Sequence, residues 1–300
     1  MRIFMTGATG VVGRRAIPLL VAAGHQVTAI GRTPEKQAGL ERMGATALAL
    51  DLFDPAAVRN AVAGHDVVVN LATHIPGSSV QMMLPWSWRE NDRIRRDASA
   101  ILVEAASAGG VSRLIQESFA PIYADAGEAW IDEEAPVRPL RYNRTVLDAE
   151  RAAAGFTQRG GVGVVLRFAL FYGPDSKPTQ EMIPVVRKGW APMPGLPGAF
   201  LSSVSHDDAA TAVVAALGVP AGIYNVADDE PLRRSEFFGS LADALGVPPP
   251  KLPPSWITPL FGAMGEMLSR SLRISNRKLR DASGWAPKYP SVREGWQAVA

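Results

Sequence analysis

Three glycines at intervals of three residues, Gly7, Gly10 and Gly13, have a type and spacing that can do chemistry. They follow a short apolar run at residues 2–6 and precede a helical pattern at residues 11–23. Glycine lets a backbone turn tightly and approach a ligand closely, and the N–H groups at the start of a helix attract anions. A strand-to-helix loop of this kind predicts a site for the phosphates of a dinucleotide, and the alternative is a purely structural tight turn.

The residue that follows the second expected strand distinguishes between the two nicotinamide dinucleotides. A carboxylate at that position binds the ribose hydroxyls of NAD, but this sequence reads Ile30-Gly31-Arg32. A guanidinium forms paired hydrogen bonds with a ribose 2′-phosphate, and Lys36 follows within reach. The pattern favours NADP(H), with NAD(H) as the alternative, and the simplest other interpretation of Arg32 is an exposed turn residue.

Two further strand ends are expected at the same cofactor. Asp51 and Leu52 come just after the third expected strand, where they are placed to meet the adenine. Asn70-Leu71-Ala72 ends the fourth strand beside the glycine loop. Ligands of open parallel sheets bind outside the carboxyl ends of the strands, so these residues should lie around one site.

Short apolar runs alternate with helical patterns over the first two-thirds of the chain. The sequence predicts strands at residues 2–6, 26–30, 46–50, 66–71, 112–117 and 162–168, and helices at 11–23, 34–43, 55–63, 92–109 and 142–159. This alternation is typical of an α/β fold with a doubly wound parallel sheet covered on both faces. After Pro174, segments rich in proline and glycine, such as 191–198, indicate a second lobe over the ligand-binding edge of the sheet.

Composition and charge argue against several classes of protein. The 300 residues are 47% hydrophobic and carry a formal net charge of +2, so no nucleic-acid partner is expected. There is no cysteine, the four histidines lack metal-ligand spacing, and no metal site is predicted. No signal peptide and no run of about 18 apolar residues occurs, which predicts a cytoplasmic protein without a membrane partner. Asp207 and Asp208 are expected to cap a helix.

Eight short motifs follow one another along the chain, at residues 6–13, 70–72, 116–118, 166–168, 172–174, 204–208, 222–226 and 283–287. Together they resemble the extended short-chain dehydrogenase/reductase superfamily, the branch of the NAD-dependent epimerases and dehydratases. The resemblance implies a Rossmann-type domain over residues 1–172 with a returning segment near 200–226. It also implies a smaller substrate-binding lobe over residues 173–300, and a homodimer formed by the helices near 92–109 and 142–159.

The resemblance also extends the set of expected cofactor contacts beyond the glycine loop and Arg32. The full set is Gly7, Thr9, Gly10, Val11, Val12, Gly13, Arg32, Lys36, Asp51, Leu52, Leu71, Ala72, Thr73, Gln116, Glu117, Tyr142, Arg167 and Phe168. The residues that it implies for catalysis are Tyr142 and Ser118.

Enzymes of this superfamily carry a Tyr-x-x-x-Lys pair at the start of the long helix after the fifth strand. Here the pair reads Tyr142 and Val146, so the lysine is absent. Its charge would lower the tyrosine pKa from about 10 toward the working pH. Without it Tyr142 should stay protonated, which suits proton donation in a reduction and makes it a poor base for an oxidation.

A second departure concerns the serine or threonine that the superfamily places four residues before the tyrosine of its Tyr-Gly pair. That tyrosine corresponds to Tyr123, and the position four residues earlier holds Phe119. Ser118 serves as the hydrogen-bond donor only if the local register shifts by one residue. Otherwise Ser118 and Glu117 line the nicotinamide site.

A third departure bears on the substrate. Leu170 stands where members that bind nucleotide sugars tend to have asparagine, and an apolar side chain cannot make that hydrogen bond. A proline-marked loop expected near the cleft adds Met82, Met83, Leu84, Trp86 and Trp88. These residues predict a small-molecule substrate that is less polar than a nucleotide sugar, and internal packing is their alternative role.

The residues and the resemblance together predict an NADP(H)-dependent oxidoreductase that reduces a carbonyl group, with Tyr142 as proton donor or substrate anchor. Two alternatives stay open. One is an NADP(H)-binding sensor or regulatory protein without turnover, which the missing lysine favours. The other is an epimerase or dehydratase that recycles its bound cofactor.

Overall fold

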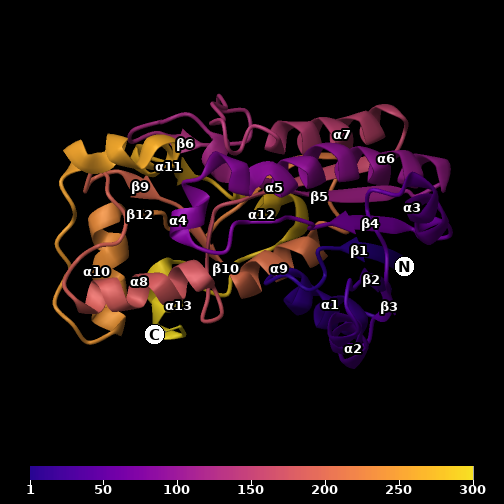
Figure 1. The fold of residues 1–300 in the computed structure, drawn as a ribbon, viewed down its shortest axis with the longest axis horizontal. Helices are drawn as coiled ribbons and strands as arrows, with labels where there is room; N and C mark the ends of the chain where they lie inside the picture. Colours follow the sequence, from indigo (N-terminus) through magenta and orange to yellow (C-terminus); the bar gives the residue numbers. More distant parts are fainter. Residues whose placement is uncertain (300) are drawn as a thin grey trace.

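A seven-stranded parallel sheet forms the centre of the computed structural model, which describes residues 1–299 (Figure 1). The strand order is β11-β7-β5-β4-β1-β2-β3. Strands β2 and β3 therefore follow one another on one side of β1, and β4, β5, β7 and β11 follow one another on its other side. The strands are β1 (Arg2–Thr6), β2 (Gln26–Ile30), β3 (Thr46–Leu48), β4 (Val67–Asn70), β5 (Arg113–Phe119), β7 (Val162–Phe168) and β11 (Gly222–Val226). Their carboxyl ends point toward the C-terminal lobe.

All six predicted strands form, and the predicted doubly wound α/β fold is confirmed. The ends differ by two residues or fewer: β3 and β4 are shorter than expected, and β5 continues to Phe119. The seventh strand, β11, comes from far along the chain and pairs in parallel with β7, where Tyr224 lies opposite Leu166. Most residues of these strands are buried, as expected for a sheet covered on both faces.

Helices cover both faces of the sheet (Figure 1). On one face lie α1 (Gly13–Ala22), α2 (Pro34–Arg42), α9 (His206–Ala215) and α12 (Arg277–Ser283), and on the other lie α3 (Pro55–Val62), α6 (Ser99–Ala108) and α7 (Val146–Gln158). Each face has its own apolar core, the first centred on residues such as Ile17 and Val213 and the second on Leu102 and Phe156. Among residues 1–299, no helix has both the length and the apolar character needed to cross a membrane.

The helical segment predicted at 92–109 is longer than expected and is not uniform. It consists of α5 (Arg89–Arg93), the π-helical turn η2 (Ile94–Ala98) and α6 in succession. Arg95 lies in the π-helical turn, is buried, and donates to Glu117 of β5 at 2.9 Å. The wider turn therefore coincides with a buried ion pair between the helix and the sheet.

Two predicted helix starts are wrong. The helix predicted at 142–159 begins four residues later, at Val146. Oδ1 of Asn143 accepts a local hydrogen bond from the N–H of Leu140, which favours a turn, and Oγ1 of Thr145 donates to Asp92. α9 begins at His206, and its cap is Ser205, whose Oγ accepts from the backbone N–H of Asp208 at 2.9 Å. Asp207 and Asp208 thus lie in the first turn and do not cap the helix.

A C-terminal lobe packs beyond the carboxyl ends of the strands (Figure 1). Its helices α8 (Lys177–Arg187), α10 (Arg234–Ala244) and α13 (Val292–Gln297) surround the fully buried ring of Trp296, which lies 5.0 Å from the ring of Tyr172. The remaining elements are α4 (Ser79–Met82), η1 (Pro85–Trp88), η3 (Ala120–Ile122), β6 (Trp130–Ile131), β8 (Leu170–Tyr172), β9 (Phe200–Leu201), β10 (Ser203–Ser205), β12 (Leu232–Arg233), η4 (Ser255–Phe261), α11 (Gly262–Ser269) and β13 (Arg273–Ile274).

Candidate functional site

The glycine loop between β1 and α1 is shaped by close backbone packing. Gly7 has a φ of 67°, and a Cβ atom at this residue would lie 2.2 Å from the carbonyl carbon of Leu71. A Cβ atom at Gly13 would lie 2.5 Å from the carbonyl oxygen of Gly7. α1 starts directly at this loop without a side-chain cap, and the N–H groups of Arg14 and Arg15 donate to the carbonyls of Gly10 and Val12. What the helix offers an anion is the positive end of its dipole. The loop therefore fits the pyrophosphate of a dinucleotide.

A buried polar network fixes the strand ends beneath the loop. Thr6 donates from Oγ1 to Oδ1 of Asn70 at 2.6 Å, and Asn70 donates from Nδ2 to Oε1 of Gln116 at 2.9 Å. The backbone N–H of Ala72 also donates to Asn70. The network joins the ends of β1, β4 and β5, and it uses Gln116 to position the loop.

The predicted ribose site lies at the end of the neighbouring strand β2. Arg32 and Lys36 are both exposed, and neither forms an ion pair with any residue in 1–299. Thr33 caps α2 through its side chain, which orients the segment that carries Arg32. Further along the edge, Asp51 accepts from the N–H of Phe53 at 3.0 Å and is exposed. The structure thus leaves the cationic side chains of this edge free.

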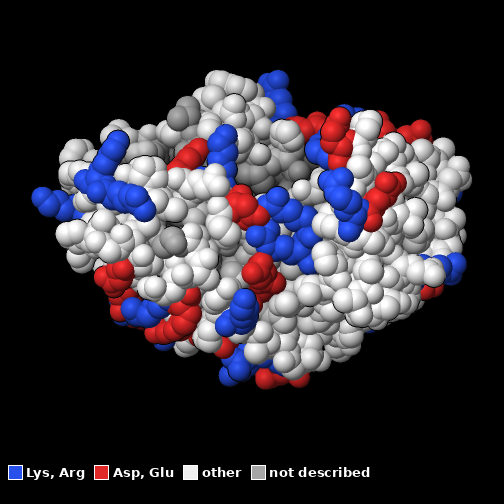
Figure 2. Space-filling model, turned by 90° about the horizontal axis from the view of Figure 1, so that it is seen from below, with Lys and Arg blue, Asp and Glu red and all other residues white. Residues whose placement is uncertain are grey.

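The lower face of the molecule, which carries α1 and α9, has basic and acidic side chains gathered around a hollow near its middle (Figure 2). Arg15 of α1 forms ion pairs with Asp175 at 2.9 Å and with Asp207 at 2.6 Å. Arg14 also pairs with Asp175, and His206 lies 3.0 Å from the same carboxylate. These contacts join the start of α1 to the C-terminal lobe.

Tyr142 lies in the turns that precede α7 and is buried, with an exposed fraction of 9%. Its hydroxyl donates to Sδ of Met267 in α11 at 2.6 Å, and its ring lies 4.8 Å from the ring of Trp88. Burial raises the pKa of Tyr142 well above its ordinary value, and the charges of Arg270 and Arg95 offset this only in part. The phenol therefore stays protonated, as the sequence predicts.

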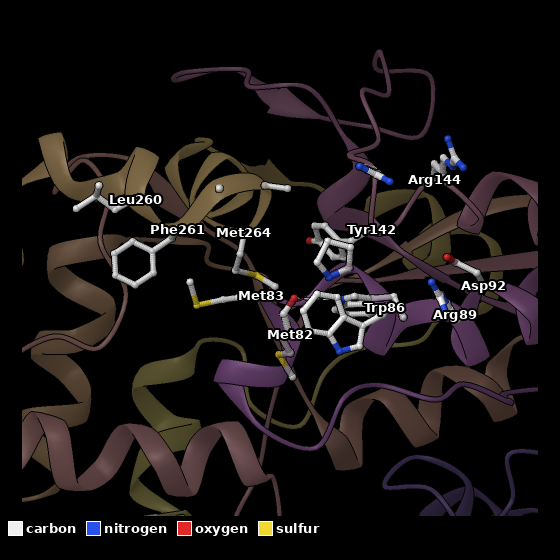
Figure 3. Close-up of a pocket in the computed structure, with 15 residues that line it drawn as sticks. Met82, Met83, Trp86, Arg89, Asp92, Tyr142, Arg144, Leu260, Phe261 and Met264 are labelled. Carbon is white, nitrogen blue, oxygen red and sulfur yellow. Dashed lines mark hydrogen bonds between the residues drawn. The ribbon is translucent and has the colours of Figure 1, made fainter.

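A cavity of about 600 Å³ opens beside Tyr142 (Figure 3). One wall comes from the loop before α5 and the other from η4 and α11. The residues that line it are Met82, Met83, Pro85, Trp86, Trp88, Arg89, Asp92, Arg141, Tyr142, Arg144, Leu260, Phe261, Gly262, Ala263 and Met264. Most of these are apolar, and the charged side chains are toward one end, where Figure 3 shows Arg89, Asp92 and Arg144.

The sequence matches the model of a family described as NAD(P)H-binding over residues 7–169, which is more than half of the chain. The chain belongs to this family. It is also 34% identical to the 3-diazoavenalumate denitrifying reductase of a Streptomyces species, and the match covers 98% of this chain and 99% of that relative. With its Rossmann-type sheet, the chain is an NAD(P)-dependent oxidoreductase of the extended short-chain dehydrogenase/reductase type.

Another relative is named a reductase, and solved structures share the fold. The oxidoreductase is 25% identical to the 2-alkyl-3-oxoalkanoate reductase of Shewanella oneidensis over 92% of this chain and 73% of that protein. Among solved structures, a human epimerase family protein with NADPH is similar at a TM-score of 0.81 with 20% identity, covering 100% of this chain and 99% of that one. The UDP-glucose 4-epimerase of Thermus thermophilus with NAD has a TM-score of 0.79 and 25% identity, covering 100% and 97%.

Several residues expected at the site of this oxidoreductase have internal partners. Ser118 donates from Oγ to Oε1 of Glu150 at 2.5 Å, and Arg167 holds both oxygens of Glu150, at 2.8 and 2.7 Å. Phe168 is buried in the core of the sheet. Phe119, at the position of the usual catalytic hydroxyl, packs against the cluster that contains Tyr142. Tyr142 therefore lies among apolar neighbours, and Ser118 lies in a separate buried network.

The cavity shows what the sequence could and could not reveal. The methionine and tryptophan loop was expected near the cleft, and Met82, Met83, Trp86 and Trp88 do line the cavity. The opposite wall, from Leu260 to Met264, was missed because it lies more than a hundred residues away from Tyr142 along the chain and carries no motif. Arg141 and Arg144 were also missed, although both flank Tyr142 in the sequence.

Proposed function

We propose that this oxidoreductase uses NADPH to reduce a carbonyl group of a small molecule that is less polar than a nucleotide sugar. The observation that carries the proposal is the protonated phenol of Tyr142 on the wall of a largely apolar cavity of about 600 Å³. A protonated phenol donates a proton to the oxygen of a carbonyl undergoing reduction. The names of two relatives, one of Streptomyces and one of Shewanella, also support a reductase.

The preference for NADPH rests on the end of β2. The residues that follow Ile30 are Gly31, Arg32 and Thr33, and none of them offers a carboxylate to ribose hydroxyls. An unpaired, exposed guanidinium at Arg32 suits the 2′-phosphate of NADPH, and Lys36 adds a second positive charge on the first turn of α2. The pyrophosphate is assigned to the loop between Gly7 and Gly13.

The chemistry assigns one task to each group. When bound, NADPH supplies the hydride that forms the new C–H bond. Tyr142 transfers its hydroxyl proton to the carbonyl oxygen, which forms the O–H bond of the product alcohol, and the phenolate regains a proton from water. Met267 holds the hydroxyl until a substrate oxygen replaces its sulfur as the acceptor. Because Val146 stands where the lysine would be and Arg270 and Arg95 offset the effect of burial only in part, Tyr142 stays protonated and is not available as a base for the reverse oxidation.

The walls of the cavity support a substrate with apolar character, whereas Leu170 packs against the core of the C-terminal lobe and does not line the cavity. Trp86, Met83 and Leu260 are exposed toward solvent at this surface, and substrate binding would cover apolar area that is otherwise hydrated. The relatives are named for 3-diazoavenalumate and for 2-alkyl-3-oxoalkanoates, and neither name refers to a nucleotide sugar.

One observation favours a second function, an NADPH-binding sensor without turnover. Val146 replaces the lysine that would bind the nicotinamide ribose, and it is fully buried. A site that binds the cofactor but has lost this contact could report the redox state of the NADPH pool.

The test combines cofactor binding with a panel of aromatic and aliphatic ketones. NADPH fluorescence should show binding, and loss of NADPH absorbance should show turnover with at least one ketone. Tyr142→Phe should lower kcat about 100-fold or more and leave NADPH affinity unchanged, because it removes only the proton donor. Tyr289→Phe, far along the chain and outside the cavity, is the matched control. Binding without turnover would favour the sensor, and full activity of Tyr142→Phe would refute the role of the phenol.

A further inference from the structure

Arg234 is a buried cation whose hydrogen bonds are incomplete. It is the first residue of α10 and has an exposed fraction of 0%. Its Nη2 atom donates to the backbone carbonyl of Leu268, but its Nε and Nη1 atoms have no partner among residues 1–299. Burial of the guanidinium lowers the pKa of Arg234 to about 10. Burial of a charge without a counter-charge lowers the stability of the folded protein, so the unpaired guanidinium of Arg234 destabilises this fold unless a partner binds to it.

The other buried arginines of the chain have carboxylate partners. Arg95 pairs with Glu117 at 2.9 Å, and Arg167 pairs with Glu150 at 2.7 Å. Arg270 pairs with Glu266 at 3.3 Å and also donates to a backbone carbonyl. No carboxylate within residues 1–299 forms an ion pair with Arg234. Within residues 1–299, Arg234 is therefore the buried arginine without a carboxylate partner.

The position of Arg234 connects it to the cavity beside Tyr142. The carbonyl that it contacts belongs to Leu268, and the preceding residue, Met267, accepts the hydrogen bond of Tyr142. Residues of the same helix, α11, line the cavity. The guanidinium therefore contacts the same helix, α11, that supplies both one wall of the cavity and the acceptor of the Tyr142 hydroxyl.

The segment 191–198 closes the other side of Arg234. A Cβ atom at Gly195 would lie 2.7 Å from Cζ of Arg234, so only glycine leaves room for the guanidinium. Met193 from the same segment packs against the cluster of Tyr142 and Trp88. Since this segment and α11 together cover Arg234, binding of an anion there requires that they separate.

We propose that Arg234 binds a carboxylate group of the substrate whose carbonyl is reduced at Tyr142. This proposal rests on the proposed function and adds that the substrate is an acid with an apolar body. The cofactor phosphates are assigned to the glycine loop and to Arg32, at the other end of the site, so they leave Arg234 without a partner. The arginines at the cavity rim, such as Arg141, are exposed and need no ligand because water solvates them.

Calorimetric titration of the full chain with benzoate, in the presence of NADP⁺, tests the assignment. Benzoate should bind, and benzamide, its neutral analogue, should bind at least tenfold more weakly. Arg234→Met should lower benzoate affinity at least tenfold, and Arg234→Lys should have an intermediate affinity. Arg187→Met, which removes an exposed arginine of α8 outside the cavity, should match the wild type. NADP⁺ affinity, measured in the same samples, tests the proposed function separately from the anion site.

The thermal midpoint separates ligand binding from a structural role. If Arg234 awaits a ligand, Arg234→Met without benzoate should melt at or above the wild-type temperature, because it removes an unpaired buried charge. A midpoint that falls while benzoate affinity persists would overturn the proposal. So would equal binding of benzamide, loss of benzoate affinity in Arg187→Met instead of Arg234→Met, or binding of inorganic sulfate without benzoate. If Arg234→Met does not fold, unchanged benzoate affinity in Arg234→Lys would overturn it.

Discussion

Arg32 is exposed at the carboxyl end of β2, and no carboxylate in residues 1–299 pairs with it. We expect Arg32→Asp to weaken NADPH binding about 10- to 100-fold, because hydrogen bonds to a charged group contribute about 1.5–3 kcal/mol. NADH lacks the 2′-phosphate, so its affinity should stay the same or rise, since an aspartate at this position can accept from ribose hydroxyls. Fluorescence titration with both cofactors measures the change in preference.

Arg59→Asp is the matched control for this substitution. Arg59 is an exposed arginine on α3, at the far side of the sheet from α2, and the same reversal of charge there should leave both affinities unchanged. An equal loss of NADPH affinity in the two variants would show only a long-range effect of net charge. Unchanged NADPH affinity in Arg32→Asp would remove the argument for NADPH over NADH.

At the scale of single residues, the sequence identified side chains but not their partners. Tyr142 was expected at the site, and it does lie on the cavity wall. Its acceptor, Met267, lies 125 residues further along the chain, and no local pattern joins the two. Ser118 has the right residue type for catalysis, but the register of β5 directs its hydroxyl to Glu150. Such partners depend on tertiary packing, which short-range spacing does not encode.

The loop between β1 and α1 owes its shape to close packing, which a comparison of two glycines can measure. Gly7 and Gly24 have similar φ angles, 67° and 80°, but only Gly7 lies against other backbone atoms. Gly24→Ala should cost about 1–2 kcal/mol for the left-handed backbone alone. Gly7→Ala should cost a further 1–3 kcal/mol, roughly, because its Cβ atom would overlap Leu71.

Urea unfolding measures both variants, and NADPH titration adds a second readout. Only Gly7→Ala should lose NADPH affinity, since only Gly7 belongs to the phosphate loop. Equal stabilities of the two variants would show that the loop relaxes without cost around the added methyl group.

The contact between α9 and α1 should make stability depend on pH. His206 has an exposed fraction of 2%, and burial, with the charges of Arg15 and Arg14, lowers its pKa to about 4. In the unfolded chain a histidine has a pKa of about 6.5, so the unfolded state binds more protons between pH 6.5 and 4. The free energy of unfolding should therefore fall as pH is lowered through this window, by up to about 3 kcal/mol from His206.

His206→Asn isolates this contribution because asparagine does not titrate. Urea unfolding at several pH values gives the free energy of unfolding of the wild type and of the variant. The difference between these two free energies should shrink as pH falls from 6.5 to 4. A constant difference in the free energy of unfolding between wild type and variant over this range would show that His206 does not cause the pH dependence.

At the scale of elements, the sheet and the starts of α2 and α3 could be predicted, and the start of α7 could not. Buried parallel strands are short apolar runs between turn residues, and all six expected runs became strands. The start of α7 was placed four residues early because the spacing of Tyr142 and Val146 fits a helix equally well. Two hydrogen bonds decide the outcome: Asn143 accepts one from the N–H of Leu140, and Thr145 donates the other to Asp92 of α5, far away along the chain.

At the scale of the whole molecule, the sheet and the C-terminal lobe have separate apolar cores. The core of the lobe centres on Trp296, which packs against Tyr172 and Phe237, whereas the glycine loop belongs to the sheet. Trp296→Ala should destabilise the lobe by about 3–5 kcal/mol through the cavity it leaves. NADPH affinity should change less than about threefold, because every residue assigned to the cofactor phosphates lies on the sheet edge.

The same variant should lose ketone reduction, because the lobe supplies α11 and with it one wall of the cavity. Trp256→Ala provides the matched control: its indole has an exposed fraction of 74% and belongs to neither core, so the thermal midpoint should stay near that of the wild type. Parallel loss of NADPH affinity and turnover in Trp296→Ala would mean that the two cores form one cooperative unit. Retained affinity with lost turnover would mean that the sheet binds the cofactor on its own and that the lobe selects the substrate.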